Sequence, residues 1–295
     1  MKDILKRGTS FDGCVRIFAA TTTELVNEAQ KIHQTFPVAS AALGRTLTAG
    51  VLMSAAGLKA DEDTLTLQIK GDGPLGSIVV CADSKSDVRG YVVNPYVDLP
   101  LNEAGKLDVG GAVGAGVLNV VRDLGLKEPY IGQIPLVSGE IAEDITMYYA
   151  QSEQIPTAVA LGVLVDTDHS IKAAGGFMVQ MMPGATDETA DIIEKSIKNA
   201  GAVTKMIDSG MTAEDIIFAI AGDIGVMIEN EDTLPHYKCT CSKERMEKAL
   251  ISIGKKELED IITEQGQAEL SCQFCNNKYN FSEAELRELL KKATK

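Results

Sequence analysis

Four of the six cysteines in the chain lie in two short clusters near its C-terminal end. Cys239 and Cys241 form a C-x-C pair in "HYKCTCSKERM", and Cys272 and Cys275 form a C-x-x-C pair in "LSCQFCNNKYNF". Each pair places two sulfurs close enough to bind one metal ion, and the two pairs together supply the four thiolates of a usual structural zinc site. The spacing therefore predicts that the two segments fold together around one Zn²⁺ per chain.

Composition indicates the compartment in which these cysteines work. The 295 residues carry 42 acidic and 28 basic side chains, a net charge of −14, which argues against nucleic-acid or anionic-membrane partners. The N-terminus lacks the apolar stretch of a signal peptide, and no run approaches the roughly 18 apolar residues of a membrane span. We therefore expect a cytoplasmic protein, in which clustered cysteines bind metal or are redox-active and do not form a disulfide framework.

The chain is predicted to be an α+β protein with a mixed α/β domain over residues 1–182. Alternating apolar residues predict antiparallel strands, and two apolar segments predict packed helices, the second of them deeply buried. The expected helices cover 21–36 and 37–57, and the expected strands cover 63–71, 76–83, 87–95, 158–165 and 171–183.

Residues 183–231 are predicted to form a helical linker. Apolar side chains recur at helical spacing through residues 187–207, and a second helix is expected over 212–228. Glycines 201, 210, 222 and 225 interrupt this pattern, and each costs about 1 kcal/mol in a helix interior. The segment therefore needs a neighbouring surface to remain ordered.

Residues 232–295 are predicted to form a small zinc-binding domain. Its 11 acidic and 11 basic side chains cancel, so the whole net charge of the protein lies before residue 232. Ser242 is expected to cap a first helix, which a second helix and a short strand follow. Ser282 and Glu285 are expected to form the capping box of a last helix. The apolar core of a 64-residue domain gives only marginal stability, whereas binding of structural zinc contributes about 10–16 kcal/mol. Metal binding and folding of this domain should therefore be one event.

The residues alone leave the role of the metal open. Most cytosolic four-cysteine sites are permanent staples, which favours a constitutive zinc-ribbon adaptor protein. The C-x-C pair weakens this preference in favour of a redox switch, because each neighbouring pair can be oxidised to its own disulfide and oxidation would remove the metal. A third alternative is a thiol–disulfide oxidoreductase using Cys272 and Cys275, but a turn follows this motif where a helix N-terminus would be expected.

Other candidate sites have simpler structural interpretations. "GDGPLG" at 71–76 is predicted to be a tight turn because Pro74 removes a phosphate-binding N–H, and "GGAVGAG" at 110–116 is predicted to be a packed turn. The acidic residues Glu140, Glu143 and Asp144 are expected on a solvated helix face. His236 is an alternative metal ligand, but four cysteines leave it no role.

The remaining histidines and cysteines have no motif near them. His33 and His169 are expected to be structural or exposed, and Cys14 and Cys81 to be buried, inert thiols. We predict no catalytic residue and no organic cofactor site, and we expect that the protein is not an enzyme.

Longer motifs connect the chain to a known family. Beside the cysteine pairs these are "KGDGPLG" at 70–76, "VVRDLGLKEPYIGQIPLVSGEIAED" at 120–144, "YYAQSEQIPTAVALGVLV" at 148–165 and "AAGGFMVQMMPGA" at 173–185. Along essentially its full length the chain resembles the 33 kDa redox-regulated heat-shock chaperones, or 33 kDa chaperonins. The resemblance implies an α/β N-terminal domain, a helical linker and a C-terminal redox-switch domain.

The resemblance also implies a function and site residues. Zinc would be bound by Cys239, Cys241, Cys272 and Cys275 in the reduced, inactive protein. Oxidation would form the disulfides Cys239–Cys241 and Cys272–Cys275, release zinc, and unfold the switch domain and linker. The exposed apolar surface would then hold unfolding client proteins without ATP, and the activated protein would associate as a homodimer.

Overall fold

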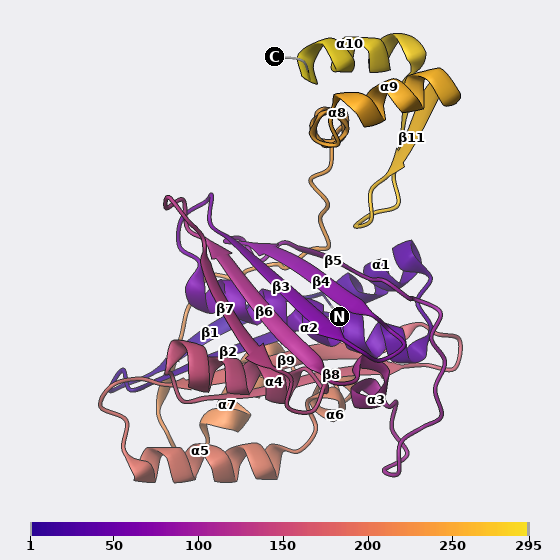
Figure 1. Cartoon of the computed structure of the whole chain (residues 1–295). Helices are drawn as coiled ribbons and strands as arrows, with labels where there is room; N and C mark the ends of the chain where they lie inside the picture. The colour runs from indigo at the N-terminus through magenta and orange to yellow at the C-terminus, as the bar shows by residue number, and fades with distance from the viewer. Residues whose placement is uncertain (1, 294–295) are drawn as a thin grey trace. The chain divides into compact units, whose positions relative to one another are not determined.

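The computed structural model describes residues 2–293 and divides the chain into two compact units (Figure 1). The first unit is Met1–Lys238 and the second, which we call the cysteine unit, is Cys239–Lys295. The mixed architecture of antiparallel sheets and packed helices confirms the predicted α+β class. By its contacts the helical segment 183–231 is part of the first unit, and the division between units follows Lys238.

The first unit contains two antiparallel sheets. One has the strand order β10-β1-β2-β9-β8, and the other has the order β5-β4-β3-β6-β7. The strands of the first sheet are β1 (Leu5–Ser10), β2 (Val15–Thr21), β8 (Thr157–Val165), β9 (Ile171–Met181) and β10 (Val226–Ile228). Those of the second are β3 (Thr64–Gly71), β4 (Ser77–Asp83), β5 (Val88–Val92), β6 (Gly116–Asp123) and β7 (Tyr130–Pro135).

The helix α2 (Pro37–Gly57) forms the centre of this unit. It begins with a proline in its first turn, where the missing N–H costs nothing, and it packs against strands of both sheets (Figure 1). Its length and composition would suffice for a membrane span, but 94% of its most apolar 18-residue window is buried inside the protein. The predicted deep burial of this helix is confirmed.

The first sheet is covered on both faces, as the strand β2 shows. Phe18 and Ala20 belong to the core that surrounds α2, whereas Ile17 and Ala19 belong to a second core on the opposite face. Alternating residues of a strand point to opposite faces of the sheet, so the nearly continuous apolar sequence of β2 reflects burial from both sides.

Helices of the segment 183–231 cover the second face (Figure 1). They are α5 (Asp187–Ala200), α6 (Val203–Asp208) and α7 (Ala213–Ala221). The helix α6 packs against β9 and β8, α7 packs against β2 and β1, and α5 packs against α7. The predicted helix over 212–228 is too long, because α7 ends at Ala221. Gly222 follows it with φ of 58°, and residues 226–228 then form β10, which pairs with the edge of β1.

Shorter helices and glycine turns complete the described part of the first unit. The helices are α1 (Thr23–His33), α3 (Val109–Val113), α4 (Ala142–Tyr148) and the π-helical turn η1 (Tyr149–Glu153). "GDGPLG" is the predicted tight turn: a Cβ on Gly71 or Gly73 would collide with the backbone around Val113. The segment 110–116, predicted to be a packed turn, is partly helical: its first four residues belong to α3, which ends before Gly114, whose φ is 75°.

In its described residues, 239–293, the cysteine unit consists of three helices and a β-hairpin. These are α8 (Lys243–Ser252), α9 (Lys255–Glu264), β11 (Gln267–Ser271), β12 (Lys278–Ser282) and α10 (Glu283–Ala293). The Ser242 hydroxyl caps α8, and the Ser282–Glu285 capping box at α10 is present, which confirms both predicted caps. The buried apolar core of the cysteine unit is small and consists of Leu250, Leu258, Ile262, Phe281, Leu286 and Leu289.

Candidate metal centre

The two cysteine pairs lie in loops next to regular structure of the cysteine unit. Cys239 and Cys241 precede the capped N-terminus of α8. Cys272 directly follows β11, and Cys275 lies in the turn before β12. The C-x-x-C motif is therefore itself in the hairpin turn, whereas the turn was predicted to follow it. As predicted, the motif is not at a helix N-terminus.

Backbone hydrogen bonds fix the turn that contains the second pair. The Cys272 carbonyl accepts hydrogen bonds from the N–H groups of Cys275 at 3.3 Å and Asn276 at 2.8 Å, and the Cys272 N–H donates to the Asn277 carbonyl at 2.9 Å. Asn276 has φ of 58°, the left-handed conformation that asparagine tolerates better than most residues. In the folded unit, these bonds therefore fix the backbone that carries the two thiols.

The four sulfurs converge on one point. All four Sγ atoms lie within 4.8 Å of one another, with Cys239 Sγ 3.7 Å from Cys272 Sγ and Cys241 Sγ 3.4 Å from Cys275 Sγ. In a tetrahedral zinc site with Zn–S bonds of 2.3 Å, neighbouring sulfurs are about 3.8 Å apart. The donor set and its size therefore fit a four-thiolate metal site, and this group could hold a metal ion.

The thiols of the cluster differ in acidity. Burial raises the pKa of Cys241, but hydrogen bonds from the Tyr279 hydroxyl and the neighbouring thiols outweigh this and lower the pKa to about 7. Burial raises the pKa of Cys239 and that of Cys275, against opposing hydrogen bonds from backbone N–H groups. The hydrogen bond to Cys241 raises the pKa of Tyr279 to about 12. Tyr279 therefore favours the thiolate of Cys241.

Tyr279 is a residue of the site that sequence reasoning missed. Its hydroxyl lies 3.0 Å from Cys241 Sγ. The turn predicted at "NNKYN" is wrong for its last three residues, because residues 278–282 form β12, in which half-buried Tyr279 and buried Phe281 alternate with exposed polar residues. That alternation was the available signal for a strand.

His236 is engaged elsewhere and does not replace a cysteine. Its Nδ1 lies 3.0 Å from Asp87 Oδ1, and the potential ligands that cluster in the described part of the chain are the four cysteines. His33 is buried, with Nε2 3.0 Å from the Tyr237 hydroxyl, and the His169 ring packs edge-on against Phe36. These two positions confirm structural histidines.

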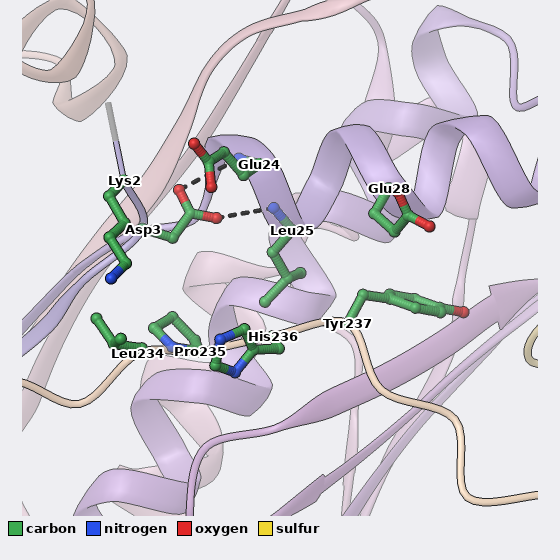
Figure 2. A pocket seen from close by; sticks show the side chains of 9 residues that line it. All are labelled: Lys2, Asp3, Glu24, Leu25, Glu28, Leu234, Pro235, His236 and Tyr237. Atoms are coloured by element: carbon green, nitrogen blue, oxygen red, sulfur yellow. Dashed lines mark hydrogen bonds between the residues drawn. The ribbon is translucent and has the colours of Figure 1, made fainter.

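His236 and Tyr237 belong to an extended segment, residues 233–238, that we call the strap. Its backbone pairs with the first residues of β1 and β5 through three hydrogen bonds of 2.8–2.9 Å. They run from Leu5 N–H to the Thr233 carbonyl, from Val88 N–H to the His236 carbonyl, and from Lys238 N–H to the Val88 carbonyl. Figure 2 shows the strap facing α1 across a pocket of about 230 Å³. Asp3 borders this pocket and accepts hydrogen bonds from the first N–H groups of α1, those of Glu24 and Leu25.

The expectation of a solvated acidic face over 140–144 is wrong for Asp144. Asp144 is fully buried, and its carboxylate accepts hydrogen bonds from the N–H groups of Val137, Ser138 and Ile141 at 2.7–3.2 Å. Glu140 forms an ion pair with Arg45 and accepts a hydrogen bond from the Gly110 N–H. These carboxylates organise a loop and the start of α4, a structural role that the linear sequence did not reveal.

Cys14 and Cys81 lie outside the cluster. Cys14 is in the turn before β2 and Cys81 is in β4, and both are half-buried, so the expectation of full burial is wrong. Burial and the neighbouring Asp12 carboxylate raise the pKa of Cys14, which keeps this thiol protonated and unreactive at neutral pH.

Comparisons with known proteins agree with this architecture along the chain. The family model described as Hsp33 protein matches residues 3–282. The 33 kDa chaperonin of Clostridium beijerinckii is 53% identical over 291 residues, 98% of this chain and 99% of that protein. The 33 kDa chaperonin of Geobacillus kaustophilus is 50% identical over 297 residues, 100% of both.

A solved structure has the same fold. The crystal structure of the 33 kDa chaperonin (heat shock protein 33 homolog) from Thermotoga maritima aligns with a TM-score of 0.91 and 44% identity. The alignment covers 100% of this chain and 99% of that one. Identity of this extent over the whole length, together with the shared fold and the four-cysteine cluster, shows that the chain belongs to the Hsp33 family of chaperones.

Proposed function

We propose that the protein is a redox-regulated, ATP-independent holdase of the cytoplasm. In the reduced state, one Zn²⁺ bound by Cys239, Cys241, Cys272 and Cys275 keeps the cysteine unit folded and the chaperone inactive. Oxidation releases the metal and exposes apolar surface that holds unfolding proteins, and the activated protein forms a homodimer. The observation that carries the proposal is the convergence of four thiols within 4.8 Å in a unit whose own core is small.

The donor set supports zinc as the metal. Four thiolates in a small tetrahedral cluster select soft or borderline-soft ions, and zinc is the usual occupant of such a site. When bound, zinc would hold all four sulfurs as thiolates and join the loop before α8 to the β11–β12 hairpin. The buried side chains of the cysteine unit alone would leave it marginally stable.

The oxidative step joins neighbours in sequence. The two thiolates of Cys239 and Cys241 give two electrons to one molecule of peroxide, whose O–O bond breaks. With two protons from solvent, this yields one disulfide and two molecules of water. The two thiolates of Cys272 and Cys275 consume a second peroxide in the same way. Disulfide sulfurs are poor zinc ligands, so the metal and the folding energy that it supplies are lost together.

The helical segment 183–231 supports the second half of the proposal. Ile193, Val203, Met206, Ile216 and Ile220 are buried in the core that this segment forms with β2 and β9. Gly201, Gly210 and Gly222 interrupt its helices with positive φ angles, so its order depends on this docked surface. Undocking would expose apolar surface rich in Ile, Val and Ala on the segment and the sheet, which suits binding to varied unfolded chains.

A paired assay tests the proposal. Zinc release, followed with a chromogenic chelator, and suppression of light scattering by a thermally unfolding client are measured before and after treatment with hydrogen peroxide and mild heat. We expect one zinc released per chain, with holding activity appearing over the same time course.

Matched cysteine variants sharpen this assay. Cys14→Ser with Cys81→Ser should behave as the unaltered protein, whereas Cys272→Ser should not retain zinc. A protein that keeps its zinc through the treatment, or that holds the client equally well when reduced, would contradict the proposal and would favour a constitutive zinc-binding adaptor.

A further inference from the structure

The Tyr279 hydroxyl forms a contact with one sulfur of the cluster that the proposed switch does not by itself require. Its oxygen lies 3.0 Å from Cys241 Sγ, within hydrogen-bonding distance. A thiolate that binds metal has no proton, so in that state the tyrosine must be the donor and the sulfur the acceptor. The contact is therefore an O–H to S⁻ hydrogen bond from a residue that is not itself a metal ligand.

Packing within the folded cysteine unit positions this hydroxyl. Tyr279 lies opposite Leu270 in the β11–β12 hairpin, and both side chains pack against the small core of the cysteine unit. The same hairpin carries Cys272 and Cys275 in its turn. Tyr279 is thus on the hairpin of the second cysteine pair but contacts the first pair through Cys241, a half-buried thiol that oxidants can approach.

We propose that Tyr279 is a positioning residue that restrains Cys241, so that its hydrogen bond slows oxidation of this sulfur and sets the threshold of the switch. This inference rests on the proposed function, because it assumes that Cys241 binds metal and is later oxidised. A hydrogen bond to a ligand atom from a residue outside the ligand set is a usual way for proteins to tune that ligand.

The chemistry explains why a donor at this sulfur slows the reaction. The Cys241 sulfur attacks one oxygen of a peroxide, the O–O bond breaks, and a sulfenic acid and hydroxide result. The Cys239 thiolate then attacks the sulfenic sulfur, forming the S–S bond and expelling a second hydroxide, and both hydroxides leave as water after protonation. The first step needs a sulfur lone pair, which the Tyr279 hydroxyl partly occupies and stabilises.

The test is the variant Tyr279→Phe, which removes the hydroxyl and keeps the ring in the core. Zinc-loaded protein is treated with hydrogen peroxide in excess free zinc, so that site occupancy is equal, and cysteine modification is followed by mass spectrometry. We expect Cys241 in the variant to be oxidised about fivefold faster, because in the unaltered protein part of the hydrogen bond to the charged sulfur is lost on reaching the transition state. Tyr130→Phe, which removes an exposed hydroxyl from the first unit, should not change the rate.

A spectroscopic measurement separates tuning of the sulfur from loosening of the fold. Both proteins are loaded with Co²⁺, whose sulfur-to-metal charge-transfer absorption depends on the electron density at the thiolates. Loss of the hydrogen bond should move this absorption to longer wavelength, whereas helix content by circular dichroism should remain unchanged.

The outcomes distinguish the inference from the proposal beneath it. If the unaltered protein binds neither Zn²⁺ nor Co²⁺, the proposed function fails and the inference fails with it. If metal binds and peroxide releases it, but Tyr279→Phe has the same absorption and the same oxidation rate, the inference alone is overturned. Faster oxidation together with lost helix content would also overturn it, since Tyr279 would then act only through packing.

Discussion

Replacing Tyr237 by phenylalanine is expected to loosen the strap, residues 233–238, without unfolding the first unit. The Tyr237 hydroxyl donates to the Gly90 carbonyl at 2.7 Å and lies 3.0 Å from Nε2 of His33. Phenylalanine keeps the ring but leaves a carbonyl and a buried imidazole without this partner.

The size of the effect follows from these contacts. Loss of one short hydrogen bond beside a buried polar group costs about 2 kcal/mol. If the strap opens as a local unit, this cost raises its opening equilibrium constant by about 30-fold. The amides of Val88 and Lys238 report that opening directly, because each donates to a carbonyl across the strap pairing.

Hydrogen–deuterium exchange of the full-length protein measures the prediction. Exchange at Val88 and Lys238 should accelerate about 30-fold in Tyr237→Phe, while amides in the centre of β9 keep their protection. Tyr96→Phe, at a residue that is 64% exposed, is the matched control and should leave the strap unchanged. Unchanged exchange at Val88 and Lys238, or equal acceleration in β9, would refute a locally opening strap held by this hydroxyl.

Three further outcomes are expected. Asp144→Ala should lower the free energy of unfolding of the first unit by about 4 kcal/mol in urea, since buried N–H groups lose their acceptor. Glu143→Ala is the control and should change this free energy by less than about 0.5 kcal/mol. Equal effects of the two variants would contradict the structural role of Asp144. Burial raises the pKa of Asp3 to about 6 against hydrogen bonds from the start of α1, so its stabilising contribution is complete below pH 4 and is lost as pH rises through 6. The stability of Asp3→Asn relative to the unaltered protein should therefore increase by up to about 3 kcal/mol between pH 4 and pH 8, and a difference independent of pH would exclude this titration. Removing metal with a strong chelator should abolish the helical signal of the cysteine unit but not that of the first unit, because about 10–16 kcal/mol of metal binding exceeds what its small core supplies; a unit that keeps its helices without metal would overturn this reasoning.

Much of the local structure could be predicted because its cause is local. The alternation of Leu65, Leu67 and Ile69 gave β3, and the capping residues Ser242 and Ser282 gave the starts of α8 and α10. The mistakes arose where distant groups decide the outcome. Residues 226–228 continue an apolar helical pattern, yet they form β10 because β1 offers an unpaired edge.

The candidate site divides in the same way. The four cysteines could be predicted as one cluster because ligand spacing is a local property of each loop, and their sulfurs do converge. Tyr279 could not, because its hydroxyl meets Cys241 only after the β11–β12 hairpin and the small core orient its ring. Asp144 was misplaced for the same reason, since its partners are backbone groups of a loop that forms only in the folded protein.

The sequence by itself therefore determined which atoms can bind a metal and which segments prefer helix or strand, since both follow from spacing and from short-range backbone preferences. Tertiary structure alone decided which thiol receives a hydroxyl donor, which carboxylates are buried, and that the glycine-interrupted segment packs on a sheet that is buried on both faces. Those features depend on burial and on contacts between residues far apart in the chain, and such contacts exist only after the chain has folded.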